Sequence, residues 1–233
     1  MGLELSEEMV HDIIEWDVEN WRHSLDYWLQ QSTLNLLNSR GLEIGSRNGG
    51  LSLWLAHHGC NVICSDVNGP TELAMEKHIK YSLTNLIEYS SIDATELPYK
   101  NEEFDVIVFK SVLGGVGSNN NIEAQKKAIE EIHRVLKPGG ELFFAENLSA
   151  SPLHKTLRKK FVNWGNSWRY INLNELSEFC SIFSNVHYTT TGFFSTLGRN
   201  EKQRRLLAKF DQKLMNKITP NNWKYIVMGV AKK

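Results

Sequence analysis

The chain has 233 residues, of which 41% are hydrophobic and 23% charged, with a formal net charge of −1 at pH 7. This length suits one large α/β domain, and the near-neutral charge excludes a general electrostatic attraction to nucleic acid. No apolar run approaches the roughly 20 residues of a membrane span, and an N-terminus with four glutamates in fifteen residues is unlike a signal peptide. Cys60, Cys64 and Cys180 lack metal-ligand spacing, so we expect no metal site and buried thiols of a cytoplasmic protein.

Apolar residues recur at helical spacing near the N-terminus, from Val10 to Leu29. They predict a helical cap over residues 1–38, ahead of a single domain over residues 39–233. Two alternatives stay open for the apolar stripe of this cap. It either packs on the edge of the sheet or forms a lid over a binding site.

The segment RGLEIGSRNGG, residues 40–50, predicts a short strand followed by a sharp turn at Gly45. The next residues, LSLWLAHH, predict a helix that ends at Gly59. Glycine lets the backbone adopt positive φ and approach a ligand closely, and the free N–H groups that open a helix favour anionic or polar groups. This unit predicts a site for an adenosine-containing ligand, with a tight turn that binds nothing as the alternative.

Polar residues follow each of the next predicted strands. Asp66 closes a strand about twenty residues after the turn, a spacing at which an acid can accept both hydroxyls of a ribose. The predicted strands and their polar ends are 61–66 with Asp66, 87–93 with Asp93, 104–109 with Lys110 and Ser111, and 141–146 with Glu146. In a parallel sheet these ends converge on one edge.

From Leu42 to Glu146 the chain resembles the class I S-adenosylmethionine-dependent methyltransferases. Their first motif, an acid and then three glycines at alternate positions, stands here as Glu43, Gly45, Arg47 and Gly49. The later segments DATELPYKNEEFDVIV and HRVLKPGGELFF also resemble the family. Arginine replaces the middle glycine, so Arg47 must either avoid positive φ or adopt it at a cost. Its side chain either reaches the carboxylate of the cofactor or lies solvated at the rim of the loop.

The resemblance implies a Rossmann-like, doubly wound α/β fold with a seven-stranded sheet whose last strand is antiparallel, near residues 223–230. It implies S-adenosylmethionine as cofactor, with Asp66 on the ribose and Asp93 and Ala94 facing the adenine. The candidate cofactor-binding residues are Trp21, Arg22, Glu43, Gly45, Ser46, Arg47, Gly49, Asp66, Val67, Asp93, Ala94, Lys110 and Ser111. N-terminal helices often cap the cofactor in this family, which favours the lid. We then expect deletion of residues 1–30 to weaken cofactor binding more than it unfolds the domain.

Methyl transfer to a hydroxyl requires a positioned base, and residue order makes Glu146 and His154 the candidates. His133 is expected to be structural, and His78 to lie on a solvated helix face. The loop 110–121 is expected to lie beside the reacting methyl group, and it lacks the Asn-Pro-Pro-Tyr pattern of amino-directed nucleic-acid and protein methylation. We therefore expect no nucleic-acid partner.

The acceptor pocket is expected after Glu146. The aromatic residues of segment 162–170 either stack on a sugar ring or belong to the core, and the basic helix 201–218 either is a solvated surface or docks an anionic partner. The chain looks similar to bacterial methyltransferases of surface-polysaccharide biosynthesis, which makes a sugar hydroxyl the first expected acceptor. The alternatives are a small-molecule or lipid-type O- or N-methyltransferase and a cofactor-binding protein without turnover.

Overall fold

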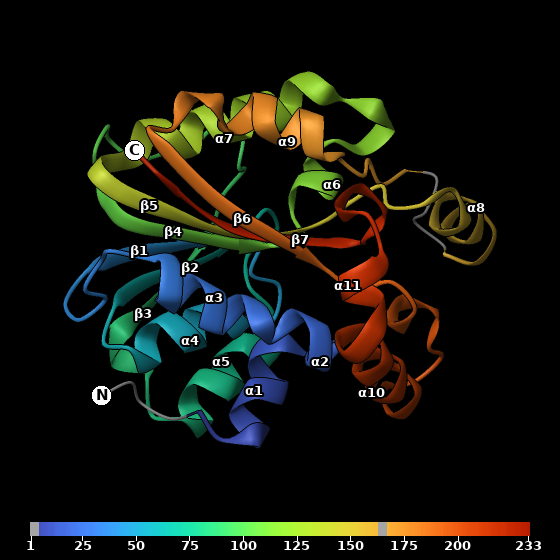
Figure 1. Cartoon of the computed structure of the whole chain (residues 1–233). Helices are drawn as coiled ribbons and strands as arrows, with labels where there is room; N and C mark the ends of the chain where they lie inside the picture. Colours follow the sequence, from blue (N-terminus) through green and yellow to red (C-terminus); the bar gives the residue numbers. More distant parts are fainter. Residues whose placement is uncertain (1–4, 163–166) are drawn as a thin grey trace.

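Seven strands form one sheet in the computed structural model, which describes residues 5–162 and 167–233 (Figure 1). The strand order is β3-β2-β1-β4-β5-β7-β6, and all pairs are parallel except those that β7 makes with β5 and β6. The strands are β1 (Arg40–Ile44), β2 (Asn61–Asp66), β3 (Ile87–Ser91), β4 (Phe104–Lys110), β5 (Leu136–Asn147), β6 (Asn185–Thr191) and β7 (Ile226–Lys232). This arrangement confirms the expected fold class, including the antiparallel last strand.

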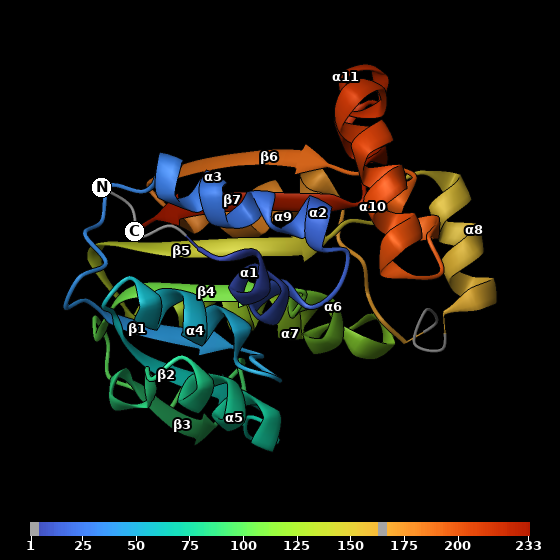
Figure 2. The ribbon, with the colours of Figure 1, turned by 90° about the horizontal axis from the view of Figure 1, so that it is seen from below.

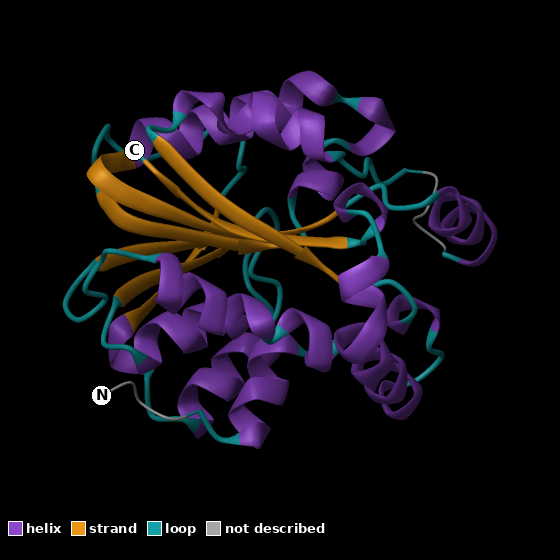
Figure 3. Cartoon of the chain, in the orientation of Figure 1, coloured by secondary structure: helices purple, strands orange, loops and turns teal. Residues whose placement is uncertain are grey.

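Helices cover both faces of the sheet (Figures 1 and 3). Helices α1 to α5 lie on one face, α7 and α9 lie on the other, and α6, α8, α10 and α11 gather beyond the carboxyl ends of the parallel strands. The helices are α1 (Glu7–Ile14), α2 (Val18–Trp21), α3 (His23–Gln31), α4 (Gly50–His57), α5 (Glu72–Lys80), α6 (Leu113–Val116), α7 (Ile122–Val135), α8 (Pro152–Phe161), α9 (Leu173–Phe179), α10 (Glu201–Phe210) and α11 (Asn216–Ile218). A π-helical turn, Asp211–Met215, joins α10 to α11.

The central strands are apolar along almost their whole length, as expected for strands with helices on both faces. In β4, Val106, Ile107, Val108 and Phe109 are all buried. Their side chains alternate between the two core clusters, with Val106 and Val108 in one and Ile107 and Phe109 in the other. The polar residue that follows, Lys110, therefore marks the point where the strand leaves the core.

The N-terminal helices share the core of the sheet. Ile13, Ile14, Trp21 and Trp28 are each at most 2% exposed and belong to the same buried cluster as Val108 on β4. The Trp28 indole stacks on a phenylalanine of β5 and donates a hydrogen bond from Nε1 to the Phe144 carbonyl. The apolar stripe of the cap thus packs on the sheet, so deletion of residues 1–30 would expose a large part of this core as well as remove a cover from the site.

No helix in the described ranges combines the length and the apolar character needed to cross a membrane. The loop 110–121, expected to be mobile or tightly turned, contains the short helix α6 and a 3-10 turn, Ser118–Asn120. Residues 163–166, with Trp164 of the aromatic segment, lie outside the described residues.

Candidate active site

The turn between β1 and α4 is tightly enclosed by its neighbours. Gly45 and Gly49 both have positive φ, +65° and +66°. A Cβ atom on Gly45 would lie 2.5 Å from Val112 Cγ2, and one on Gly49 would lie 2.6 Å from His78 Cε1. Both positions therefore require glycine, for conformation and for space.

Arg47 occupies the place of the missing glycine in a left-handed conformation, with φ of +47°. Its backbone N–H donates to Asp66 Oδ2 at 2.9 Å, and its carbonyl accepts from the Thr71 N–H at 2.9 Å. The side chain is exposed. Of the two conformations open to it, Arg47 adopts the strained one, which costs about 1 kcal/mol.

Replacing Arg47 by glycine is expected to stabilise the protein by about 1 kcal/mol, because the left-handed conformation then carries no steric cost. For a domain of this size the melting temperature should rise by about 2–4 °C, measurable by calorimetry. If the guanidinium holds the cofactor carboxylate, the same variant should also bind S-adenosylmethionine more weakly. Unchanged affinity would leave Arg47 as a solvated side chain.

Asp66 stands at the carboxyl end of β2, beside this turn. Val67, next in the chain, is 60% exposed, and Ala94 is buried at the end of the neighbouring strand. Asp93 turns its Oδ1 back to its own loop, where Thr95 N–H and Oγ1 both donate to it at 2.8 Å. These hydrogen bonds hold the pKa of Asp93 below its usual value, so it stays ionised.

Glu43 lies beneath the turn, not on its surface. It is 3% exposed and accepts hydrogen bonds from Leu51 N at 3.1 Å, Ser52 N at 2.7 Å and Ser52 Oγ at 2.6 Å. Burial raises the pKa of its carboxyl to about 7. Glu43 thereby satisfies free N–H groups in the first turn of α4 and fixes the helix against β1.

Lys110 connects the sheet to the N-terminal cap. Its ammonium donates to the Ile14 carbonyl at 3.1 Å, at the end of α1, and lies 5.3 Å from the centre of the Trp21 ring. Burial lowers the pKa of Lys110. The cap thus covers the carboxyl end of β4.

Two buried polar atoms in this region have no hydrogen-bond partner among the described residues, Ser46 Oγ and Trp21 Nε1. Buried polar groups are nearly always paired, so both atoms are free to bind a ligand or water. Six further buried side-chain atoms in the described ranges also lack a partner, Trp54 Nε1 and Thr219 Oγ1 among them, so this feature is not confined to this edge. Together with the glycine turn and Asp66, Ser46 Oγ and Trp21 Nε1 fit a polar ligand at the carboxyl edge of β1, β2 and β4.

Two candidate cofactor residues are engaged within the protein. Both terminal nitrogens of Arg22 donate to the Glu7 carboxylate, at 2.9 and 2.8 Å, which directs Arg22 toward α1. Ser111 has φ of +58°, and its Oγ accepts from Asn147 Nδ2 at 2.6 Å. The structure therefore gives Arg22 a role in holding the cap together.

The two candidate bases are also fully engaged. Glu146 is 0% exposed and accepts from Val112 N, Leu113 N and Asn147 N at 2.7–2.8 Å, while burial raises its pKa to about 7. It caps the backbone where α6 begins. His154 is 1% exposed, and its ring nitrogens contact Ser151 Oγ at 2.7 Å and the Phe193 carbonyl at 2.8 Å. Neither side chain reaches the surface of the site in this conformation.

His78 corrects an expectation. It is completely buried and not on a solvated face, with Nε2 2.9 Å from the Gly49 carbonyl and Nδ1 2.9 Å from the Tyr89 hydroxyl. His78 supports the glycine turn from below. His133 lies on α7 with its ring edge against Phe183, which fits the structural role expected for it.

The acceptor side contains a residue that sequence reasoning did not single out. Arg158 on α8 is 8% exposed, donates to the Leu148 carbonyl at 2.6 Å, and lies 4.0 Å from the centre of the Tyr170 ring. No carboxylate in the described ranges pairs with it. Arg158 follows His154 by four residues on the same helix face, a signal that could have predicted its burial.

Trp168, from the aromatic segment, packs against Gly114 of α6, where a Cβ would lie 1.7 Å from Nε1 of the indole.

A buried polar cluster joins the cap to the C-terminal part of the chain. Asp17, 0% exposed and with φ of +47°, accepts from the hydroxyls of Ser195 and Tyr225, and its N–H donates to Glu201. Asn20 Nδ2 donates to the Tyr225 hydroxyl at 2.9 Å. Burial raises the pKa of Asp17 to about 6. No sequence pattern indicated this cluster.

The raised pKa of Asp17 predicts a pH effect on stability. The folded protein holds this proton up to about pH 6, whereas the unfolded chain releases it near the ordinary value of 3.8, so the stabilisation falls as pH rises through 6. The variant Asp17→Asn cannot lose a proton here. We expect the melting temperature of the variant minus that of the wild type to increase by several degrees between pH 5 and pH 7.5, as measured by calorimetry. A difference that stays constant over this pH range would contradict the raised pKa of Asp17.

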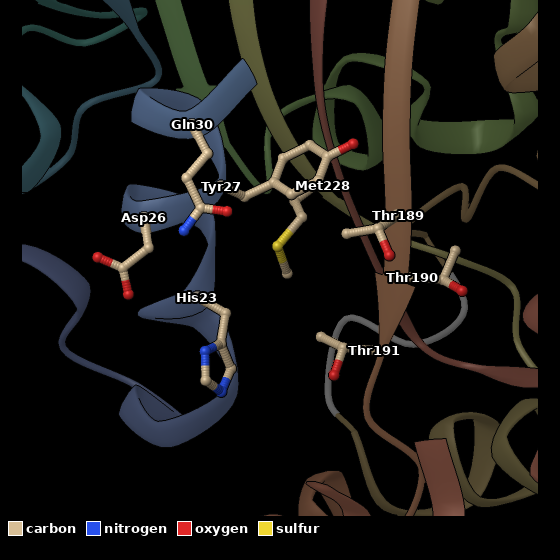
Figure 4. A pocket seen from close by; sticks show the side chains of 8 residues that line it. All are labelled: His23, Asp26, Tyr27, Gln30, Thr189, Thr190, Thr191 and Met228. Atoms are coloured by element: carbon tan, nitrogen blue, oxygen red, sulfur yellow. The ribbon is translucent and has the colours of Figure 1, made fainter. Parts of the chain in front are cut away.

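A cavity of about 310 Å³ lies away from this edge, between α3 and the strands β6 and β7 (Figure 4). Two of its polar side chains are engaged within the protein, because Gln212 contacts His23 Nε2 at 2.9 Å and Asn216 donates to Thr191 Oγ1 at 2.9 Å. Met228 lies at its base between Tyr27 and Thr189. None of the expected site residues lines this cavity.

Comparison with known proteins agrees with this site. A family model described as a methyltransferase domain matches residues 42–144. The chain is 31% identical over 101 residues to a ubiquinone/menaquinone biosynthesis C-methyltransferase of Pseudoalteromonas translucida, a match that covers 43% of this chain and 37% of that protein. The chain thus spans less than half the length of this relative.

Solved structures share the fold over most of the chain. The phosphoethanolamine N-methyltransferase 2 of Haemonchus contortus, in complex with phosphomonomethylethanolamine and S-adenosylhomocysteine, superimposes with a TM-score of 0.64 at 18% identity and covers 91% of this chain and 52% of that one. The [4+2]-cyclase SpnF superimposes with a TM-score of 0.61 at 18% identity, and the match covers 93% of this chain and 80% of that one. At such identities the likeness concerns the fold alone. Residues 42–144, which hold the glycine turn and Asp66, thus match a methyltransferase domain, and this match covers less than half of the chain.

Proposed function

We propose that this protein is an S-adenosylmethionine-dependent methyltransferase that acts on a small molecule. The observation that carries the proposal is the carboxyl edge of β1, β2 and β4. There an acid, Asp66, a glycine turn at Gly45 and a half-buried ammonium, Lys110, lie near polar atoms that the chain leaves unpaired. The family model over residues 42–144 supports the same assignment.

We assign the binding roles by position. Asp66 accepts the ribose hydroxyls, and Val67 and Ala94 flank the adenine. Ser46 Oγ and Trp21 Nε1 gain the hydrogen-bond partners that they lack within the chain, and Arg47 and Lys110 supply positive charge near the carboxylate of the methionine part. When bound, S-adenosylmethionine supplies a methyl group on a positively charged sulfur for in-line displacement.

The chain itself contributes orientation and exclusion of water. Trp21 and the end of α1 cover the carboxyl end of β4, so the reacting groups meet in a site with little water. Glu146 fixes the start of α6 through two backbone N–H groups, those of Val112 and Leu113, and so positions the loop 110–121. In this proposal Glu146 is a positioning residue, and the proton of a hydroxyl acceptor leaves through another group or through solvent.

For the acceptor we propose a ring-containing small molecule, first a sugar hydroxyl of the kind used in surface-polysaccharide biosynthesis. Trp168 and Tyr170 offer flat aromatic surfaces, and Arg158 offers a buried donor without a carboxylate partner. The second candidate is the ring carbon of a quinone precursor, favoured by the name of the curated relative. The three buried free thiols suit a cytoplasmic location for either reaction.

The test is methyl transfer from labelled S-adenosylmethionine to two panels of acceptors, nucleotide sugars and demethylated quinones, with product identification by mass spectrometry. Transfer to a sugar oxygen would support the first acceptor, and transfer to a quinone carbon the second. Tight binding of S-adenosylmethionine without transfer to any acceptor would contradict the enzymatic proposal and favour a cofactor-binding protein without turnover.

A further inference from the structure

The helix that follows β6 carries an apolar stripe on its outer face. Leu206, Phe210, Leu214 and Ile218 recur every four residues along α10, the π-helical turn and α11, and they are 71%, 45%, 44% and 64% exposed. The opposite side is anchored by Asp211, which is buried and accepts three backbone N–H groups from residues 193–195. This helix therefore buries Asp211 together with Ala208, and it exposes Leu206, Phe210, Leu214 and Ile218 where an ordinary surface helix carries polar residues.

Basic side chains line this stripe. Lys202, Lys209, Lys213 and Lys217 are exposed, and none of them forms an ion pair with a described residue. The two acids of this helix are turned inward or paired, since Asp211 is buried and Glu201 binds Arg204. An exposed apolar stripe flanked by unpaired lysines is the pattern of a helix that lies in the surface of an anionic bilayer.

Helix α8 repeats the pattern independently. It contains four Lys and Arg residues and no Asp or Glu. Its buried face is polar, with His154 and Arg158, whereas Leu153 and Phe161 are 47% and 69% exposed. Lys155, Lys159 and Lys160 are exposed beside them and have no ion pair among the described residues.

Both helices lie at the same end of the molecule, beyond the carboxyl ends of the parallel strands (Figures 1 and 2). Phe193 joins them, because its carbonyl contacts His154 of α8 and its N–H donates to Asp211. This is also the end at which Asp66 and Lys110 mark the proposed site. The whole chain is close to neutral, so these lysines make its charge markedly asymmetric.

We propose that the outer faces of α8 and of α10 to α11 form one docking surface for an anionic lipid bilayer. The leucines and phenylalanines enter the boundary between headgroups and acyl chains, and the seven lysines meet the lipid phosphates. A second copy of the chain fits this surface less well, because an isologous contact would bring two rows of lysines together. Docking here would place the mouth of the site at the membrane surface, where an amphiphilic acceptor is presented.

The experiment is flotation of the full chain with vesicles of phosphatidylcholine containing 30 mol% phosphatidylglycerol, and with vesicles of phosphatidylcholine alone. We expect binding to the anionic vesicles that weakens with added salt. Two quadruple variants test the surface. One carries Leu206→Ser, Phe210→Ser, Leu214→Ser and Ile218→Ser, and the other carries Lys202→Glu, Lys209→Glu, Lys213→Glu and Lys217→Glu. Each should lower the partition coefficient at least about a hundredfold.

Two double variants at exposed residues elsewhere serve as controls. Leu37→Ser with Ile79→Ser is the control for the serine variant, and Lys100→Glu with Lys127→Glu is the control for the glutamate variant. They should bind vesicles as the wild type does. Equal S-adenosylmethionine affinity in all variants would show that the fold is kept and separates this test from the proposed function. Absence of wild-type binding, unchanged binding of either quadruple variant, or a dimer that disappears with the serine variant while vesicles are not bound would overturn the proposal.

Discussion

Replacement of Asp66 by alanine should lower the affinity for S-adenosylmethionine about a hundredfold or more. The carboxylate stands at the carboxyl end of β2, where we propose that it accepts two ribose hydroxyls, and a hydrogen bond to a charged group contributes about 1.5–3 kcal/mol. Two such bonds correspond to about two to four orders of magnitude in affinity. Calorimetric titration of wild type and variant with S-adenosylmethionine and S-adenosylhomocysteine measures the effect.

Asp66 also accepts the Arg47 N–H, so the alanine variant loses one contact within the turn. Asp66→Asn keeps an acceptor for that N–H but lacks the charge, and we expect an intermediate loss of affinity. Glu88→Ala, an exposed carboxylate on the neighbouring strand β3, is the control and should bind as the wild type. Full affinity in Asp66→Ala would mean that the ligand does not occupy this end of β2.

Deletion of residues 1–30 is expected to unfold the protein, whereas from the sequence alone we expected it to weaken cofactor binding more than it unfolds the domain. Ile13, Ile14, Trp21 and Trp28 are at most 2% exposed, and full burial of each such side chain contributes about 1.5–3 kcal/mol. Their loss removes roughly 10 kcal/mol, which is comparable to the whole net stability of a typical domain. Far-ultraviolet circular dichroism and urea titration would measure the loss.

A single substitution separates the contribution of the N-terminal helices to core packing from their proposed role as a lid over the site. Trp28→Ala should reduce the free energy of unfolding by about 3–5 kcal/mol, because Trp28 is fully buried against the sheet. Trp16→Ala, at 38% exposure, should have a much smaller effect. A truncated chain that keeps its cooperative unfolding and loses only cofactor affinity would restore the view of the cap as a detachable lid.

The strands could be predicted well because their signal is local. The run Val106 to Phe109 is apolar throughout, and β4, Phe104–Lys110, covers the strand expected over residues 104–109. The antiparallel last strand was expected from the resemblance and is confirmed by the pairing of β7 with β5. Its first residue, Ile226, lies three residues later than expected because a 3-10 turn, Asn221–Trp223, precedes it.

The role of a side chain depends on the groups that surround it in the folded chain, and these could not be predicted from neighbouring residues in the sequence. Glu146 lies at the end of a strand as a candidate base does, yet the N–H groups of Val112 and Leu113, in the loop after β4, and that of its neighbour Asn147 enclose its carboxylate. His78 occupies an amphipathic helix, and only the packing of α5 beneath the glycine turn buries it. Asp17 and Tyr225 are more than two hundred residues apart, so their contact exists only in the folded chain.

The sequence by itself determined the order of strands and helices, the glycine turn at Gly45 and the position of Asp66, because periodicity, turn chemistry and strand ends are properties of neighbouring residues. Tertiary structure alone decided that the N-terminal helices belong to the core, that Glu146 and His154 are enclosed, and that Leu206 to Ile218 present an apolar stripe outward. The physical reason is that an amphipathic pattern specifies two faces of a helix, whereas the partners that cover one of them come from distant parts of the chain.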